Sequence, residues 1–226
     1  MRYENTTIGI FLARPNRFLA EVELDGRVEH CHVKNTGRLW ELLLPGVRAV
    51  VQKAANPGRK TPYDLIAVEH RGFWVNIDSQ APNRVFGEWL RTSEEFGAAG
   101  VLRPETRYGR SRFDYYIEMT ERKIFAEVKG VTLVEDGVAR FPGAPTLRGV
   151  KHLEELGACL GEGYEAMVAF IIQRLDVHRF APNDTMHPAF GAALRAAAQK
   201  GVRVLALGCE VTANTLSINR SLEVLL

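Results

Sequence analysis

Residues 111–133 read SRFDYYIEMTERKIFAEVKGVTL, and they decide the fold of the second part of the chain. Apolar and aromatic residues alternate in two runs, which predicts one β-strand from Arg112 to Glu118 and another from Lys123 to Val134. The polar residues 120–123 between them predict a tight turn. This hairpin carries Asp114 on its first strand and Glu127-Val128-Lys129 on its second, with twelve residues between Asp114 and Glu127.

The register of this hairpin determines whether the charged residues meet. If the turn holds an even number of residues, Met119 lies opposite Ile124 and Lys129 lies opposite Asp114. Because strand side chains alternate between faces, Asp114, Glu127 and Lys129 then share one face. Asp114 and Glu127 become diagonal neighbours at roughly 7–8 Å. A bulge or an odd turn would separate them.

Two carboxylates with a lysine are a set that metal-dependent phosphodiester cleavage can use. The carboxylates can hold a divalent cation, and the lysine can polarise the attacking water or steady charge on the phosphate. We therefore predict Asp114, Glu127 and Lys129 as catalytic residues and Mg²⁺ or Mn²⁺ as the cofactor. The alternative is an ion pair between Glu127 and Lys129 on a half-exposed sheet face.

A second Glu-x-Lys, Glu121-Arg122-Lys123, lies in the turn and is expected to be solvated. Glu127 and Lys129 instead lie inside an apolar strand, where charges are costly unless they are paired or metal-bound. A further acid could complete the metal site. The candidates are Glu88, on the preceding helix, and Glu105, on the preceding strand, although each is also common as a surface acid.

Composition sets broad limits on the class of protein. The chain has 226 residues, 46% of them hydrophobic, which suits one large or two modest globular domains. A net charge of +2 does not establish a nucleic-acid partner, so a basic surface must come from local clustering. Three cysteines form no CxxC pair, and no segment suits a signal peptide or a membrane span. We expect a reducing, cytoplasmic setting and no membrane association.

The first third of the chain predicts a small β-barrel. Apolar residues alternate with polar ones before Asp25-Gly26, a strong hairpin turn. Five short strands within about eighty residues are typical of an OB-type barrel, which we assign to residues 1–80. The expected strands are Ile8 to Leu24 with a break at Pro15-Asn16, Arg27 to Lys34, Arg48 to Lys53, Tyr63 to His70 and Phe73 to Ile77.

Residues 81–226 predict an α/β domain. Pro82 and Asn83 begin a helix that runs to about Phe96. The element order αβββαβαβ indicates a layered α/β (α+β) fold with a mixed sheet. The other expected elements are strands at 101–108, 165–173 and 202–207, the two hairpin strands, and helices at 146–160 and 187–200.

Basic and small polar residues suit contact with a nucleic-acid backbone, DNA first and RNA second, although each also suits ordinary solvent. His30-Cys31-His32 has no evident third ligand, so we favour a structural role for it over a metal site. The residues expected to bind nucleic acid are Arg14, Arg17, Asn35, Thr36, Arg38, Arg59 and Lys60 in the barrel, and Arg112, Arg148, Lys151 and His152 in the second domain.

The order of motifs along nearly the whole chain resembles the sugar fermentation stimulation protein A (SfsA) family. The motifs are Arg17-Phe18-Leu19-Ala20, Asn35-Thr36-Gly37, Pro45-Gly46, Arg59-Lys60, Tyr108-Gly109, Ser111-Arg112-Phe113-Asp114, Glu127-Val128-Lys129 with Val131-Thr132-Leu133, Phe141-Pro142, and Thr146-x-Arg148-Gly149-x-Lys151-His152.

The resemblance implies an OB-type domain followed by a restriction-endonuclease-like, PD-(D/E)XK domain of αβββαβ order. Members of the family are described as DNA-binding proteins linked to maltose metabolism and as DNA/RNA nucleases. The resemblance also implies that Asp114, Glu127 and Lys129 form the nuclease core. The rival hypothesis is a non-catalytic, non-specific DNA-binding regulator of sugar (maltose) metabolism genes, whose binding would survive loss of the two acids.

Three positions depart from the family pattern. Gly143 replaces the acid of Phe-Pro-Asp-Ala, which puts a metal or phosphate role for that position in doubt. Lys34 stands where proline often precedes Asn-Thr-Gly and is expected to add charge to the barrel loop. Gly130 follows the motif lysine where serine is frequent, and we expect this change to be neutral.

Overall fold

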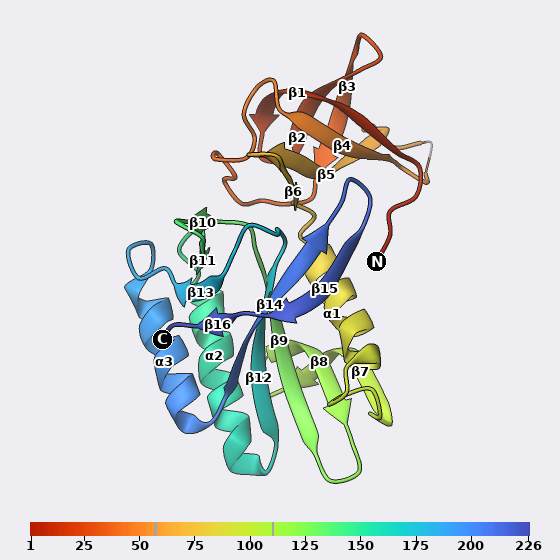
Figure 1. The fold of residues 1–226 in the computed structure, drawn as a ribbon. Helices are drawn as coiled ribbons and strands as arrows, with labels where there is room; N and C mark the ends of the chain where they lie inside the picture. Colours follow the sequence, from red (N-terminus) through yellow and green to blue (C-terminus); the bar gives the residue numbers. More distant parts are fainter. Residues whose placement is uncertain (57, 110) are drawn as a thin grey trace.

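The computed structural model describes residues 1–56, 58–109 and 111–226. A β-barrel built from the first third of the chain lies above a mixed sheet that carries helices on both faces (Figure 1). This is the α/β arrangement with an N-terminal OB-like barrel that the sequence predicted.

The barrel closes because its third strand pairs with its fifth. The sheet order is β3-β2-β1-β4-β5-β6, and the additional β3–β5 pairing joins the two ends. The turn at Asp25 and Gly26 has positive φ at both residues, as a two-residue hairpin turn requires. The strands are β1 (Thr6–Asn16), β2 (Leu19–Leu24), β3 (Arg27–Val33), β4 (Arg48–Lys53), β5 (Tyr63–His70) and β6 (Phe73–Asn76).

The strand β1 continues through Pro15, where the sequence predicted a break. The register of β1 on β2 shifts between Ala13 and Asn16, so the proline lies in an irregular part of the ladder. A residue without an N–H is tolerated at such a position.

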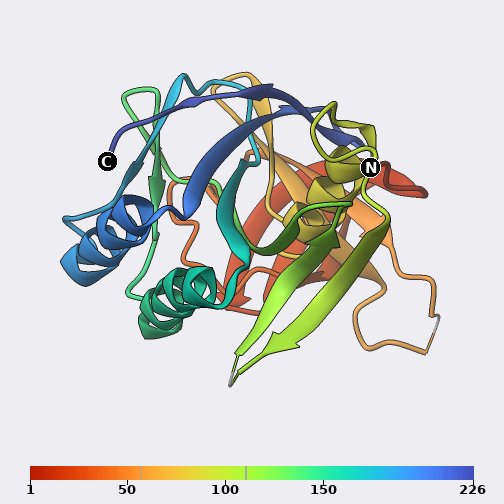
Figure 2. The same ribbon diagram turned by 90° about the horizontal axis from the view of Figure 1, so that it is seen from below.

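The second domain is built on a six-stranded sheet of order β15-β14-β12-β9-β8-β7. Helix α1 covers one face, and α2 and α3 cover the other (Figure 2). The main elements are α1 (Ala81–Thr92), β7 (Val101–Tyr108), β8 (Ser111–Glu118), β9 (Lys123–Val131), α2 (Leu147–Cys159), β12 (Glu165–Ile172), α3 (Pro188–Lys200), β14 (Arg203–Val211) and β15 (Leu216–Ser221).

A second, four-stranded sheet of order β10-β11-β13-β16 was not predicted. Its hairpin turns at Asp136 and Gly137, which have positive φ, so an Asp-Gly signal was present in the sequence. The expected strand to Val134 ends at Val131 instead. The remaining elements are β10 (Val134–Glu135), β11 (Val138–Phe141), the 3₁₀ turn η1 (Leu160–Glu162), β13 (Arg179–Pro182) and β16 (Glu223–Val224).

Helix α1 ends at Thr92, four residues before the predicted end at Phe96. Ser93 is extended, and its hydroxyl accepts the backbone N–H of Phe96, which starts a new turn. Phe96 is nevertheless fully buried with α1 against the sheet. The helix was predicted to reach Phe96 because this residue has helical spacing, and Phe96 packs with α1 although it lies outside the helix.

The β8–β9 hairpin has the predicted even turn, but its register differs from the prediction by two residues. Ile117, not Met119, pairs with Ile124, and residues 119–122 form the turn. Both isoleucines are buried beneath α1, and because the register differs by two residues, each side chain stays on the face that the prediction gave it. The paired ladder ends at Tyr115 and Ala126, and beyond it the Asp114 carboxylate accepts the Val128 N–H, so the register no longer places Asp114 diagonal to Glu127.

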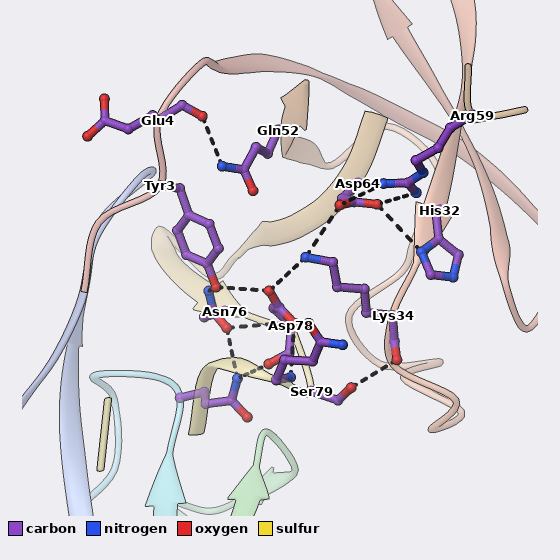
Figure 3. A network of polar contacts seen from close by, with 12 residues as sticks. Tyr3, Glu4, His32, Lys34, Gln52, Arg59, Asp64, Asn76, Asp78 and Ser79 are labelled. Atoms are coloured by element: carbon purple, nitrogen blue, oxygen red, sulfur yellow. Dashed lines mark hydrogen bonds and ion pairs between the residues drawn. The ribbon is translucent and has the colours of Figure 1, made fainter. Parts of the chain in front are cut away.

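Polar side chains join the barrel to the second domain (Figure 3). Asn76, at the end of β6, accepts a hydrogen bond from Gln173 at 2.8 Å, and Tyr3 contacts both Asn76 and Asp78. The first residues lie along the second domain, where the Met1 ammonium donates to the Leu216 carbonyl at 2.7 Å.

Lys34 is part of the same polar junction. Its ammonium lies 3.2 Å from Asp78 and 3.4 Å from Asp64 (Figure 3). The side chain of Lys34 is only 18% exposed. The charge that Lys34 was expected to add to the barrel loop is paired with the two buried carboxylates of Asp64 and Asp78.

Candidate metal centre

Asp114 lies where β8 separates from β9. Its Oδ2 accepts the backbone N–H of Val128 at 2.7 Å, so the carboxylate takes the place of a backbone ladder partner. Its Oδ1 accepts the amide of Asn83, at the start of α1, at 2.8 Å. The side chain is thus fixed by the neighbouring strand and by the helix that covers it. The sequence argument did not identify Asn83.

Glu127 projects from β9 toward α2 and is 3% exposed. Its Oε1 receives Lys129 Nζ at 2.5 Å and His152 Nδ1 at 2.5 Å. Arg148 Nε donates to the other ring nitrogen of His152 at 3.3 Å. That contact assigns the proton to Nδ1, so His152 donates to Glu127.

The two carboxylates have pKa shifts in opposite directions. Burial raises the pKa of Asp114, and the nearby charge of Glu127 adds to this effect. Burial also acts to raise the pKa of Glu127, but the His152 hydrogen bond and the Lys129 charge outweigh it and lower that pKa below its ordinary value. Glu127 is therefore the carboxylate held firmly in its ionised form.

The carboxylate oxygens of Asp114 and Glu127 are suitable ligands for a hard divalent cation. Glu127 Oε2 is buried and has no hydrogen-bond partner among the described residues, a costly condition that a cation would relieve. Within residues 1–56, 58–109 and 111–226, no three acidic, histidine or cysteine side chains cluster as a self-sufficient metal site. One or two carboxylates with waters and substrate phosphate are the usual ligands of Mg²⁺.

Neither proposed third acid joins this pair in the structure, so that expectation is corrected. Glu88 binds the Met1 ammonium at 2.6 Å and also contacts Arg84. Glu105 is exposed and pairs with Arg112 at 3.3 Å. Glu88 and Glu105 are thus each paired with a positively charged group outside the candidate site.

Four residues predicted to bind nucleic acid make contacts within the protein. Arg14 donates to three carbonyls of the 35–38 loop and to the carbonyl of Arg17, and Asn35 Oδ1 accepts the Gly37 N–H at 2.8 Å. Arg59 binds Asp64 at 2.7 Å. His152 is buried against Glu127. The two terminal guanidinium nitrogens of Arg14 and of Arg59 and the ring of His152 are thus engaged within the protein.

Seven of the predicted contacts remain exposed and stay predictions: Arg17, Thr36, Arg38, Lys60, Arg112, Arg148 and Lys151. Lys151 is 53% exposed and pairs loosely with Glu155 at 3.7 Å. His30 and His32 lie near Glu21 and Asp64, each at 3.5 Å, and Cys31 between them is buried. The structural role favoured for that motif agrees with these contacts.

Gly130, next to the candidate site, has no room for a side chain. A Cβ there would lie 2.6 Å from Gln173 Oε1 and 2.7 Å from Pro82 Cγ. Gln173 is buried and holds the domain junction through its amide. The expectation that this glycine is a neutral substitution is therefore wrong for this chain.

We expect Gly130→Ala to destabilise the protein by about 1–3 kcal/mol, the usual effect of overpacking. Urea unfolding would measure the change. Gly143→Ala is the matched control, because nothing lies within 4 Å of a Cβ at that position. Equal stability of the two variants would contradict the crowding at Gly130.

The barrel and the covered mixed sheet define a two-domain α/β protein of a known kind. A model of the SfsA N-terminal OB domain matches residues 12–77, and a model of the sugar fermentation stimulation protein RE domain matches residues 80–215. The chain therefore belongs to the sugar fermentation stimulation protein family.

Relatives named sugar fermentation stimulation protein homolog match the chain over nearly its full length. One from Desulfitobacterium hafniense is 55% identical over 96% of this chain and 94% of its own. Another from Ruminiclostridium cellulolyticum is 50% identical over 99% of both.

A solved structure described as Pyrococcus furiosus SfsA in complex with Ca²⁺ superposes with a TM-score of 0.91 at 32% identity. The match covers 100% of this chain and 98% of that chain. In the described part of the chain, no helix is both long enough and apolar enough to cross a membrane.

Proposed function

We propose that the chain is a nuclease that hydrolyses phosphodiester bonds with the help of Mg²⁺ or Mn²⁺. The observation that carries this proposal is the partnerless, buried Oε2 of Glu127 beside Asp114. The Ca²⁺ in the description of the Pyrococcus furiosus relative supports a divalent cation at a family site.

Asp114 and Glu127 would hold the cation. When bound, such a cation polarises the phosphoryl oxygen and makes a water molecule more acidic. Asn83 and the Val128 N–H fix Asp114, and His152 fixes Glu127 through its Nδ1–H. These contacts hold the two carboxylates in position before substrate arrives.

Lys129 supplies positive charge at the same place. Its ammonium is 18% exposed and lies against Glu127, so it can reach a phosphate oxygen or a water at the edge of the site. It would orient that water and offset the charge that develops on the phosphate. Arg148 and Lys151, on the exposed side of α2, would hold the nucleic-acid backbone.

The test is incubation of the protein with single-stranded and double-stranded DNA and RNA, each with Mg²⁺, Mn²⁺ or EDTA. We expect cleavage with Mg²⁺ or Mn²⁺ and none with EDTA. Salt-sensitive binding without cleavage under every condition would reject the nuclease and favour the non-catalytic regulator.

A further inference from the structure

Trp40 is the most exposed of the large hydrophobic side chains of the barrel, with 71% of its surface accessible. It lies in the segment that joins β3 to β4, and the guanidinium of Arg38 lies over its ring at 5.1 Å. Tryptophan is rarely left so open without a partner, since burying its rings is strongly favourable.

Two adjoining cavities run from this tryptophan to Gly130, the residue after Lys129. The first, of about 220 Å³, extends from Gly130, the neighbour of Lys129, to the start of α2. The second, of about 350 Å³, lies beside Trp40. They share the lining residues Arg38, Glu41, Leu133 and Gly143, so we call them together the interdomain trough.

Charge differs between the two ends of the interdomain trough. Arg38 and Arg140 face the first cavity with Glu41 as the one acid among its lining residues, which suits a phosphate. Glu41 and Glu135 face the second with Arg38, and two carboxylates repel phosphate. Carboxylates do accept hydrogen bonds from the exocyclic amines of bases.

The walls of the second cavity also suit a base. Trp40, Leu133 and Met186 give it apolar surface, and its volume lies within the range of single-ligand pockets, roughly 300–1,000 Å³. A base that stacks on an exposed aromatic ring must be unpaired and turned away from its own neighbours.

We infer that the interdomain trough binds a single strand of nucleic acid, with one unpaired base stacked on Trp40 and the adjoining backbone leading past Arg38 and Arg140 toward Lys129. This inference rests on the proposed function and gives its substrate class. A duplex keeps its bases stacked and paired, so it cannot use Trp40 in this way.

The test is fluorescence anisotropy in EDTA with three probes: a short labelled single strand, the same strand annealed to its complement, and the same strand with its bases removed. We expect Trp40→Ala to weaken binding of the intact single strand by about 5- to 100-fold. Binding of the duplex and of the abasic strand should change by less than about twofold. Trp40→Phe should keep most of the affinity, because phenylalanine still offers a stacking surface.

Phe18→Ala is the matched control. Phe18 is also exposed, and Arg17 lies over its ring at 4.7 Å, but it lines neither cavity of the trough. The Phe18→Ala variant should bind all three probes with wild-type affinity. Equal weakening by Phe18→Ala and Trp40→Ala would overturn the inference in favour of general aromatic adhesion.

Parallel cleavage assays with Mn²⁺ separate this inference from the proposed function. If wild type cuts and Trp40→Ala binds the single strand normally, the stacking site is rejected and the nuclease stands; the exposed ring then suits a protein partner. If binding depends on Trp40 but nothing is cut, the stacking site stands and the nuclease fails.

Discussion

Glu127→Gln is expected to reduce metal-dependent cleavage by at least about 100-fold, because a metal ligand supplies several kcal/mol of transition-state stabilisation. The amide keeps the shape of the side chain and removes its charge. The rate of cleavage of a labelled strand in Mn²⁺ measures the loss. Asp114→Asn should give a similar loss, because it also removes the charge of a carboxylate proposed to bind the metal. Its amide oxygen can still accept the Val128 N–H, so the strand contact is kept.

The chain contains its own matched control for this substitution. Glu121 belongs to the second Glu-x-Lys and is exposed in the β8–β9 turn. Glu121→Gln should cut at the wild-type rate. Circular dichroism would show whether each variant folds, and equal rates for folded Glu127→Gln and Glu121→Gln would contradict the assignment of the site.

Lys34→Met is expected to destabilise the protein by about 2–3 kcal/mol. Breaking a buried ion pair typically costs about 3–5 kcal/mol, because the remaining charge loses its partner. The loss is smaller here since Asp64 keeps Arg59 at 2.7 Å and Asp78 keeps the Tyr3 hydroxyl at 3.3 Å. Urea unfolding at neutral pH would measure it, with exposed Lys60→Met as the control.

The pH dependence of this effect has a definite sign. Burial acts to raise the pKa of Asp64, but the Arg59 hydrogen bond and the Lys34 charge bring it below its ordinary value. A lowered folded pKa stabilises the protein above the unfolded pKa, about 3.9, and the contribution is lost as pH falls through the folded value. The difference in free energy of unfolding between wild type and Lys34→Met should therefore become smaller below about pH 4. A gap that widens in acid would contradict the role of Lys34.

Local alternation accounts for the parts of the fold that were predicted. The barrel strands and the β8–β9 hairpin follow from period-two apolar runs and from strong turns such as Asp25-Gly26. The hairpin register depends on something less local. Ile117 pairs with Ile124 beneath α1, but alternation within the hairpin also allows Met119 opposite Ile124, because a two-residue shift keeps every side chain on its face.

The charged residues of the candidate site could be predicted from the sequence, but the residues that hold them in position could not. Asp114, Glu127 and Lys129 stand out because charges within an apolar strand need partners. His152 is remote in sequence and looked like a surface base, and only packing of α2 on β9 brings it to Glu127. Asn83 follows a helix-opening proline, and its contact with Asp114 depends on how α1 crosses the sheet.

Basic residues were the least predictable, because a sequence does not show which donors the protein itself uses. Arg14 and Arg59 resemble Arg38 and Lys60 in their loop settings. In the structure the first two bind carbonyls and Asp64, and the others remain exposed. A buried acid such as Asp64 competes for the nearest cation, and burial is a property of the folded chain.

The most direct measurement is the anomalous scattering of crystals soaked in Mn²⁺. The account predicts a single strong peak in contact with Glu127 Oε2 and Asp114, at a coordination distance between about 2.0 and 2.6 Å. It also predicts that the peak is lost in Glu127→Gln crystals treated in the same way. A wild-type map with no peak at these carboxylates, or a peak that persists unchanged in Glu127→Gln, would contradict the metal centre.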